Sequence, residues 1–330
     1  MKHTFIIASL CLAVTGALAK EPAPVATAGK VEFKDDKAAS TYTVRIEGKE
    51  AFVYLYGDDL EVPCFYPVRS PSGKLMTLKI ADKKKKQSYP HHRSFWFTDT
   101  IELAGHRSVS FYNAYYRRMD KTDPKSPFSD RIKHVSFAPG PVGKGEAKLG
   151  MKLVWQADRK TPYLDEARDM RIVALGGGEY FLDITFTVTA TYGDVRFTSD
   201  SVHYAWPYVR MHPQFSVQSG GTITNSAGGV NQRGTHNKVA TWIDYSNAVE
   251  GAAEGLAIFS HPDNDHPHKW LTRDYGCFGP RRIDARSGNR KYVLKKGQSL
   301  TRRVGVLVHR GDVKSGKVAK RYAMYAKDKL

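Results

Sequence analysis

The sequence has few cysteines and only one long apolar run. Of its three cysteines, Cys11 lies inside that N-terminal run, which leaves Cys64 and Cys277 for the folded protein. Two cysteines form at most one bridge, so a disulfide-based scaffold is excluded, and whether the two pair is left open. No other run approaches the length of about 20 residues that a membrane-spanning helix needs. The sequence therefore predicts no permanent membrane span.

The apolar run belongs to a targeting signal. A short basic start precedes the apolar residues Thr4–Val14, and Ala17-Leu18-Ala19 has the small residues of a cleavage site. This pattern is typical of a secretory signal peptide. We therefore predict that residues 1–19 are removed and that the protein is periplasmic or secreted. Residues 20–30, rich in Ala, Pro and Gly, are predicted to be a disordered lead-in to a single domain at 31–330.

Several catalytic motifs are missing as well. The sequence contains no G-x-G-x-x-G opening a helix, no Walker loop and no G-x-S-x-G elbow. A dinucleotide enzyme, an NTPase and an α/β-hydrolase are therefore disfavoured. The sequence also has fewer acidic than basic residues: 33 Asp and Glu against 51 Lys and Arg, which gives a formal net charge of +18. For an exported protein this charge favours an anionic carbohydrate over nucleic acid as the partner, although a simply solvated basic surface remains the alternative.

Period-two alternation dominates the chain from about residue 31. In residues 182–190, Leu, Ile, Phe, Val and Ala occupy every second position, and residues 42–46, 149–155 and 304–308 repeat the pattern. Such alternation indicates strands with one buried face. Turn sequences separate the runs, and no helices alternate with them. We therefore predict an all-β fold, a large antiparallel β-sandwich of the supersandwich or jelly-roll kind.

A single short helix is expected at the C-terminal end. Val318, Tyr322 and Tyr325 recur at helical spacing and share one face. Asp312 precedes them and is predicted to cap the helix.

The stretch Tyr89–Phe97 concentrates residues suited to a functional site. His91 and His92 can act as general bases or metal ligands, whereas Arg93 can bind an anion and Trp96 can contact a substrate. If the stretch is extended, neighbouring side chains point to opposite faces, so one histidine faces the site and Arg93 shares the face of His91. A structural histidine bonded to the backbone is the alternative interpretation.

A second stretch, residues 203–212, is rich in aromatic residues. Flat rings match the apolar faces of a pyranose, and the same stretch offers acid, base and carboxylate-binding groups. The alternative is a core strand whose aromatic side chains pack inward. The candidates are His203 for catalysis and Tyr204, Trp206, Arg210 and His212 for substrate binding.

A third stretch begins at residue 261 with histidines and a carboxylate. Such groups suit a divalent ion, Zn²⁺ or Ca²⁺, but their spacing fits no standard motif, so a cofactor is not assigned. The candidate ligands are His261, Asp263, His266 and His268. Further along, Trp270 and Arg273 are candidates for substrate binding. Tyr275 is a candidate catalytic residue because a neighbouring arginine favours the phenolate.

The order of these motifs resembles a known family. The chain resembles a family of secreted bacterial proteins that automatic annotation often labels "methane oxygenase PmoA". The resemblance rests on motifs in this order: Pro90-His-His-Arg93 with Trp96, then Arg210, then residues 234–245, 261–264 and 270–276. The activity in that label is rejected, because membrane methane monooxygenase subunits span the membrane several times. The resemblance instead implies a domain of unknown function connected with carbohydrate breakdown.

A weaker resemblance is to galactose mutarotase-like supersandwiches. The strand, turn and His–aromatic order at residues 182–208 is similar to theirs, which implies that His203 occupies the place of an acid histidine. The leading hypothesis is a carbohydrate-active enzyme for an anionic, uronate or sulfated, sugar or polysaccharide, most simply a polysaccharide lyase acting by β-elimination. A glycoside hydrolase or mutarotase-like epimerase, and a non-catalytic glycan-binding module, are the alternatives. The oligomeric state is not predicted.

Overall fold

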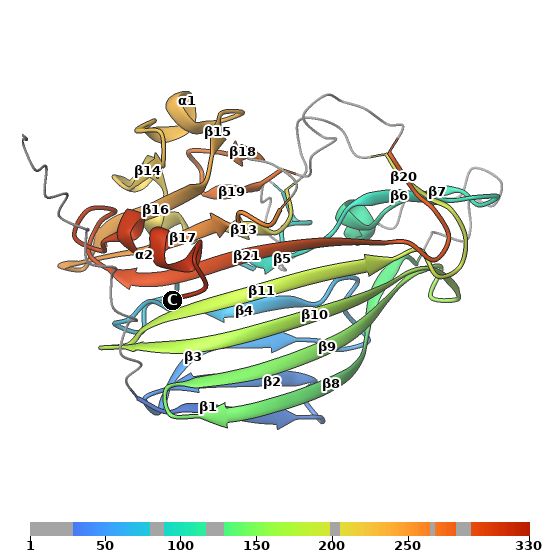
Figure 1. Cartoon of the computed structure of the whole chain (residues 1–330), viewed down its shortest axis with the longest axis horizontal. Helices are drawn as coiled ribbons and strands as arrows, with labels where there is room; N and C mark the ends of the chain where they lie inside the picture. The colour runs from blue at the N-terminus through green and yellow to red at the C-terminus, as the bar shows by residue number, and fades with distance from the viewer. Residues whose placement is uncertain (1–28, 80–88, 117–128, 199–204, 265–267, 282–291) are drawn as a thin grey trace, which may run out of the picture.

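The computed structural model of the chain describes residues 29–79, 89–116, 129–198, 205–264, 268–281 and 292–330. The predicted signal peptide and nearly all of the predicted lead-in lie outside the described residues. In the described part, antiparallel sheets form a sandwich with a short C-terminal helix, which confirms the predicted all-β class. Figure 1 shows the long strands of one sheet in front of those of a second. No helix of the described residues is long and apolar enough to cross a membrane.

The first sheet has eight strands within the described residues, and neighbours pair in the order β14-β16-β17-β21-β11-β10-β9-β8. Its strands are β8 (Arg131–Gly143), β9 (Glu146–Ala157), β10 (Thr161–Gly176), β11 (Glu179–Thr189), β14 (Thr222–Asn225), β16 (Trp242–Val249), β17 (Ala252–Ser260) and β21 (Ser299–Arg310).

The second sheet has nine described strands in the order β1-β2-β3-β4-β5-β13-β19-β18-β15. They are β1 (Val31–Asp36), β2 (Thr41–Ile46), β3 (Lys49–Leu55), β4 (Cys64–Val68), β5 (Phe95–Trp96), β13 (Tyr208–Arg210), β15 (Val239–Ala240), β18 (His268–Thr272) and β19 (Cys277–Pro280).

A smaller sheet of four described strands, in the order β20-β12-β6-β7, lies at one end of the sandwich (Figure 1). It consists of β6 (Thr100–Leu103), β7 (Ser108–Ser110), β12 (Val195–Phe197) and β20 (Val293–Leu294). The described helical segments are η1 (Phe111–Tyr116), η2 (Pro213–Phe215), η3 (Val217–Ser219), α1 (Asn231–Thr235) and α2 (Val318–Tyr325).

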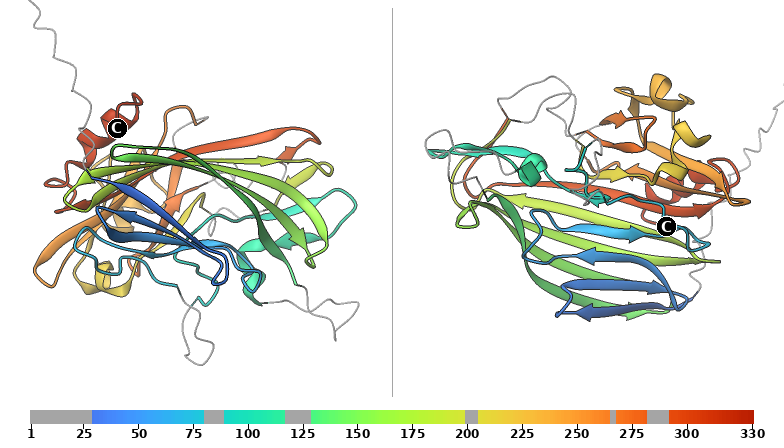
Figure 2. Two further views of the ribbon diagram at one scale, coloured as in Figure 1. Left: turned by 90° about the horizontal axis from the view of Figure 1, so that it is seen from below. Right: turned by 180° about the vertical axis from the view of Figure 1, so that it is seen from behind.

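The core lies between the two large sheets, which Figure 2 shows as two stacked layers. On β9, Leu149, Met151, Leu153 and Trp155 are buried while the residues between them are exposed or half-buried. This is the face that the period-two pattern predicts, and β2 and β11 follow it too. Burying each such side chain contributes about 1.5–3 kcal/mol before conformational entropy is subtracted. Cys64 and Cys277 are both buried and free.

The C-terminal helix is confirmed, but its predicted cap is not. Helix α2 begins at Val318, and the capping position is Lys317, whose φ is 53°. Asp312 instead accepts hydrogen bonds from the backbone N–H groups of Lys314 and Ser315, at 3.1 and 2.8 Å. Its carboxylate therefore closes the turn before the helix, because the chain makes a further turn that the spacing did not reveal.

The pairing of the short strands β5, β13 and β19 positions the side chains of the candidate site. Tyr208 of β13 pairs with Trp96 of β5, and Arg210 pairs with Cys277 of β19. Phe97 stacks on Phe186 of the opposite sheet, with 4.5 Å between ring centroids, and so faces the core. Because side chains alternate along a strand, Trp96 points away from that core. Trp96, Tyr208 and Arg210 therefore share the outer face of the nine-stranded sheet.

Candidate functional site

A turn before β5 brings the side chains of His91 and His92 into the same cluster. The backbone N–H of His92 donates to the carbonyl of Tyr89 at 3.1 Å, so the segment turns here and is not extended. The rings of His91 and His92 lie 4.6 Å apart at 80°. The expectation that only one histidine faces the site was made for an extended segment, and it does not apply to the turn that the chain forms here.

Each histidine has a tyrosine partner from η1. The Nδ1 atom of His91 lies 2.9 Å from the Tyr116 hydroxyl, and the Nε2 atom of His92 lies 3.2 Å from the Tyr112 hydroxyl. The Nδ1 atom of His92 is buried, and no described residue bonds to it. One nitrogen of a buried imidazole is thus fixed by a phenol while the other remains available.

Aromatic rings surround His92. Its ring stacks on Tyr89 at 5.1 Å and 12°, and contacts the Trp96 ring at 5.4 Å with a tilt of 34°. Tyr89 also stacks on Tyr275 at 5.2 Å, and Trp96 stacks on Tyr208 at 4.8 Å. Tyr89 is 42% exposed whereas Trp96 is 1% exposed. The cluster therefore runs from Tyr89 at the surface to the buried Trp96.

Arg210 supplies a buried positive charge beside these rings. Its guanidinium carbon lies 4.4 Å from the centroid of the Tyr275 ring. Its Nε and Nη1 atoms are buried and have no hydrogen-bond partner among the described residues, and the same holds for Nε1 of Trp96. Unpaired buried donors are costly, so this arrangement suits an acceptor-rich ligand.

Burial and neighbouring charges perturb the titration of the cluster. Burial, followed by the charges of His91, Arg210 and Arg93, holds the pKa of His92 well below its usual range. His92 is therefore neutral at pH 7 and able to accept a proton. Burial also lowers the pKa of Arg210, although an arginine remains charged.

Tyr275 departs from the sequence expectation. Arg210 and Arg273 do act to lower its pKa, as predicted, but burial outweighs them and raises the pKa of Tyr275 above that of a free phenol. The phenolate is therefore disfavoured, and Tyr275 is a protonated phenol at neutral pH.

Arg93 is engaged by protein groups. Its Nη2 donates to Oε2 of Glu61 at 2.9 Å, and its Nη1 donates to the Pro90 carbonyl at 3.1 Å. Its guanidinium carbon also lies 5.0 Å from the Tyr115 ring centroid. These contacts hold the turn that presents the histidines, so Arg93 is suited to positioning, and its substrate-binding role stays a prediction.

Three other candidates, Trp206, Trp270 and His212, form hydrogen bonds with groups of the protein itself. Trp206 donates from Nε1 to Asp99 at 2.9 Å, and Trp270, which is fully buried, donates to the Ala240 carbonyl at 2.8 Å. His212 caps η2 by accepting from the backbone N–H of Gln214 at 3.4 Å, and burial lowers its pKa. Trp206 therefore fits the interpretation of an inward-packing aromatic side chain, and the substrate-binding roles of Trp206, His212 and Trp270 stay predictions.

Arg273 contacts a histidine that sequence analysis did not single out. Its Nη1 lies 2.8 Å from Nδ1 of His236, and it donates to the Thr272 carbonyl at 3.1 Å. Burial, followed by the charge of Arg273, lowers the pKa of His236 to about 4. A neutral His236 can therefore accept from Arg273, and the substrate-binding role of Arg273 stays a prediction.

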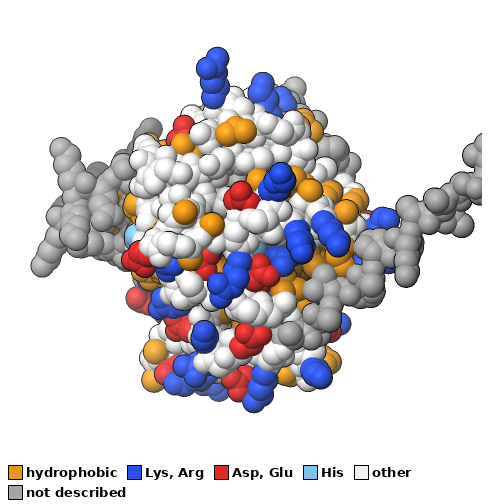
Figure 3. Space-filling model, turned by 90° about the vertical axis from the view of Figure 1, so that its left-hand side faces the viewer, with side chains coloured by type: hydrophobic (Ala, Val, Ile, Leu, Met, Phe, Trp, Pro, Cys, Tyr) orange, Lys and Arg blue, Asp and Glu red, His pale blue; other side chains and the backbone are white. Residues whose placement is uncertain are grey.

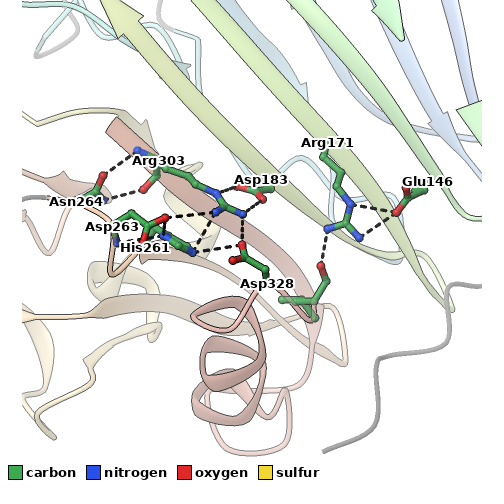
Figure 4. A network of polar contacts seen from close by, with 9 residues as sticks. Glu146, Arg171, Asp183, His261, Asp263, Asn264, Arg303 and Asp328 are labelled. Carbon is green, nitrogen blue, oxygen red and sulfur yellow. Dashed lines mark hydrogen bonds and ion pairs between the residues drawn. The ribbon is translucent and has the colours of Figure 1, made fainter. Parts of the chain in front are cut away.

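The proposed metal ligands are divided between two places. Figure 4 shows His261 with Asp263, Arg303 and Asp328, where its Nδ1 lies 3.2 Å from Asp263 and its Nε2 lies 3.2 Å from Arg303. His268 instead bonds from Nδ1 to the Arg281 carbonyl at 2.7 Å. The described residues contain no group of three His, Cys, Asp or Glu that could hold a metal ion. His266, like His203 and Tyr204, lies outside the described residues, so the metal site stays a prediction.

Several cluster residues were missed by sequence analysis. Tyr112 and Tyr116 belong to Phe-Tyr-Asn-Ala-Tyr-Tyr at 111–116, a dense aromatic run without strand alternation that could have indicated a site. Tyr89 begins the stretch that the sequence singled out, but its stacking on His92 arises only from the turn. Glu61 had no signal, because its contact with Arg93 arises only from the tertiary fold.

Basic and acidic side chains are interspersed on the face of the molecule shown in Figure 3, with apolar side chains scattered between them. That face does not present a field of one sign. The formal charge of +18 is therefore not concentrated there.

The fold is a β-sandwich, and it brings histidine, tyrosine and arginine side chains into one largely buried cluster. Residues 41–323 match the model of a family of unknown function (DUF6807), and the chain belongs to this family. No curated protein matches the sequence at a significant level.

Solved structures with a distantly similar fold include carbohydrate-active enzymes. The GH36 alpha-galactosidase AgaA of Geobacillus stearothermophilus aligns with a TM-score of 0.45 and 6% identity, over 86% of this chain and 42% of that chain. The galactose 1-epimerase of Lactobacillus acidophilus NCFM aligns with a TM-score of 0.36 and 8% identity, over 86% of this chain and 100% of that chain. A polysaccharide lyase aligns with a TM-score of 0.36 and 12% identity, over 87% of this chain and 33% of that chain. This chain spans less than half of the α-galactosidase, and at these scores the similarity describes the fold only.

Proposed function

We propose that the protein is a periplasmic or secreted carbohydrate-active enzyme that cleaves an anionic polysaccharide by β-elimination at the His92–Arg210 cluster. The observation that supports this most is the buried Arg210, whose Nε and Nη1 have no partner among the described residues, beside a neutral His92 with an unpartnered Nδ1. A carboxylate or sulfate group supplies the acceptors that these donors lack.

The arrangement suits proton abstraction next to a uronate carboxylate. Arg210 binds the carboxylate and stabilises the negative charge that develops when the neighbouring C5 proton is removed. In the tautomer that donates its Nε2 proton to Tyr112, His92 has a free lone pair on Nδ1 and accepts that proton. The C–H electrons then form the C4–C5 double bond and the C4–O bond breaks. The leaving oxygen takes a proton from Tyr275, which burial keeps as a phenol.

The remaining groups hold this arrangement. His91 contacts His92 and bonds to Tyr116, and Arg93 fastens the turn to Glu61. The exposed ring of Tyr89 offers a face for a pyranose. Elimination fits the cluster better than hydrolysis, because its one carboxylate among the described residues, Glu61, is paired with Arg93, whereas hydrolysis generally uses two carboxylates.

The test is incubation with a panel of uronate and sulfated polysaccharides, read by the ultraviolet absorbance of the unsaturated product and by new reducing ends. We expect both signals from at least one uronate polymer, and neither from His92→Ala. Reducing ends without the unsaturated product would indicate a hydrolase. Salt-sensitive retention on an anionic polysaccharide column without turnover would indicate a binding module. No activity and no retention across the panel would refute the proposal.

A further inference from the structure

A second set of unpartnered polar atoms lies inside the sandwich, away from the His92–Arg210 cluster. Arg168 of β10 is fully buried, and its Nη1 and Nη2 atoms have no hydrogen-bond partner among the described residues. The Tyr54 hydroxyl on β3 and Nδ1 of His134 on β8 are also buried and unpartnered there. Arg168 and His134 come from the eight-stranded sheet and Tyr54 from the nine-stranded sheet, and the rings of Tyr54 and His134 meet across the core.

The contacts around Arg168 explain why its two Nη atoms have no hydrogen-bond partner among the described residues. Its Nε donates to Oε1 of Glu166, and the other oxygen of Glu166 accepts from Nε1 of Trp155 at 2.7 Å. The guanidinium group also borders two apolar rings that stack on each other, with its carbon 5.5 Å from the Phe186 centroid and 5.9 Å from that of Phe97. Glu166 neutralises the charge of Arg168 through one nitrogen only. The remaining N–H groups therefore need an acceptor that these neighbours do not provide.

Tyr54 and His134 lie next to each other and within the field of Arg168. Their ring centroids are 5.7 Å apart in an edge-to-face arrangement. Burial, followed by the charge of Arg168, lowers the pKa of His134 to about 4. Burial raises the pKa of Tyr54, and the same charge opposes that change. Strand register places Arg168 beside Met151 and Met151 beside Phe137. The Phe137 ring centroid lies 6.0 Å from that of Tyr54 and 4.1 Å from that of His134, so the three groups border the same part of the core.

We infer that Arg168, Tyr54 and His134 form an internal binding site for a small hydrogen-bond acceptor, a water oxygen or a halide ion, that joins the two sheets. Either guest accepts from the Arg168 Nη groups and from the Tyr54 hydroxyl. A water can in addition donate to the neutral His134. Buried water usually occupies places where several polar groups would otherwise be unsatisfied.

Replacing Tyr54 by Phe tests the site, because it removes only the hydroxyl. If the hydroxyl bonds to a guest, Tyr54→Phe leaves the guest and Arg168 with one partner fewer, and Tm falls by about 2 °C. If the hydroxyl has no partner, removing it relieves a desolvation penalty, and Tm stays the same or rises. Tyr180→Phe is the matched control, because the buried Tyr180 hydroxyl donates to the Arg69 carbonyl at 2.9 Å and its loss should lower Tm.

A crystal structure of the full chain, with and without a bromide soak, identifies the guest. Density within hydrogen-bond distance of the Arg168 Nη atoms supports the site, and an anomalous bromide peak there identifies a halide. A halide should also raise the Tm of the wild-type protein in sodium chloride over that in sodium gluconate of equal ionic strength, and should do so less in Tyr54→Phe. No density at the Arg168 Nη atoms, or an unchanged or raised Tm in Tyr54→Phe, would overturn the inference.

Discussion

At the residue scale, Arg210 is the group on which recognition of an anion depends in the proposed function. A guanidinium forms two parallel bonds with a carboxylate, whereas the ammonium group of lysine forms a single point contact. Nε and Nη1 of Arg210 are buried and have no hydrogen-bond partner among the described residues, so the side chain has two N–H donors, on different edges of the guanidinium, for acceptors of a ligand.

We therefore expect Arg210→Lys to weaken binding of an anionic oligosaccharide by about 10-fold or more, which corresponds to the loss of one charge-assisted hydrogen bond. Isothermal titration calorimetry measures the change, and Tm shows whether the variant is folded. Arg45→Lys, at an exposed arginine on β2, is the matched control and should bind like the wild-type protein. Equal affinity of Arg210→Lys and wild type would contradict the role of Arg210.

The low pKa of His92 predicts the shape of the acid side of the pH profile. The neutral imidazole is the form that accepts a proton, and burial together with His91 and the two arginines holds its pKa well below the usual value of about 6.5. As pH falls, kcat/KM should therefore stay constant through pH 6.5 and decline only well below it. Initial rates on a polymer identified in the panel give this profile, and an inflection at or above pH 6.5 would rule out His92 as the base.

At the element scale, the ion pair between Glu61 and Arg93 holds the turn that presents both histidines. The two side chains are 15% and 6% exposed and lie 2.9 Å apart. Glu61→Gln removes the charge from a poorly solvated pair, so the free energy of unfolding should fall by about 1.5–3 kcal/mol. Urea unfolding measures the loss, and activity should fall as well because the turn loosens.

Glu50→Gln is the comparison for that variant. Glu50 pairs with Arg69 at 2.6 Å, but the side chains are 33% and 35% exposed. Solvent weakens such a pair, and the expected loss is below about 1 kcal/mol. An equal loss in the two variants would show that burial of the Glu61–Arg93 pair has no special importance.

The elements also show which features the sequence could predict. Alternation along residues 149–155 and 182–188 identified strands and their buried faces, because one residue in two faces the core along the whole strand. The turn at Pro90–His91 was missed, because a turn of two residues is too short to show a repeating pattern of apolar residues. The structure reveals it through the hydrogen bond from the backbone N–H of His92 to the carbonyl of Tyr89. The contacts of His92 with Tyr112 and of Arg93 with Glu61 join residues 20 and 32 positions apart, which no pattern in one sequence predicts.

At the scale of the whole molecule, one buried ion pair connects two neighbouring regions of the eight-stranded sheet. Nε2 of His309 on β21 lies 2.7 Å from Oδ1 of Asp244 on β16, and both side chains are fully buried. The second carboxylate oxygen accepts from Ser246 at 2.9 Å, and Nδ1 of His309 lies 3.0 Å from the Arg310 carbonyl. β17 lies between these two strands in the sheet, so the pair holds the sheet together across an intervening strand.

This pair predicts how stability depends on pH. Burial alone would lower the pKa of His309, but the charge and hydrogen bond of Asp244 outweigh burial, and the pKa is raised above its usual value. The folded state therefore binds a proton more tightly than the unfolded chain. The stabilisation is fully present below about pH 6.5, the unfolded value, and is lost as pH rises through the raised pKa of the folded state. The contribution of His309 to the free energy of unfolding from urea titrations should decline as pH increases from 6 to 9.

Two variants separate His309 from other titrating groups. His309→Gln breaks a fully buried pair, so it should cost about 3–5 kcal/mol at pH 6 and should reduce the decline in stability toward pH 9. His106→Gln, at an exposed histidine, should retain the wild-type dependence. If His309→Gln retains the same decline as wild type, the raised pKa of His309 is not its source, and Asp244 binds a neutral imidazole in the folded protein.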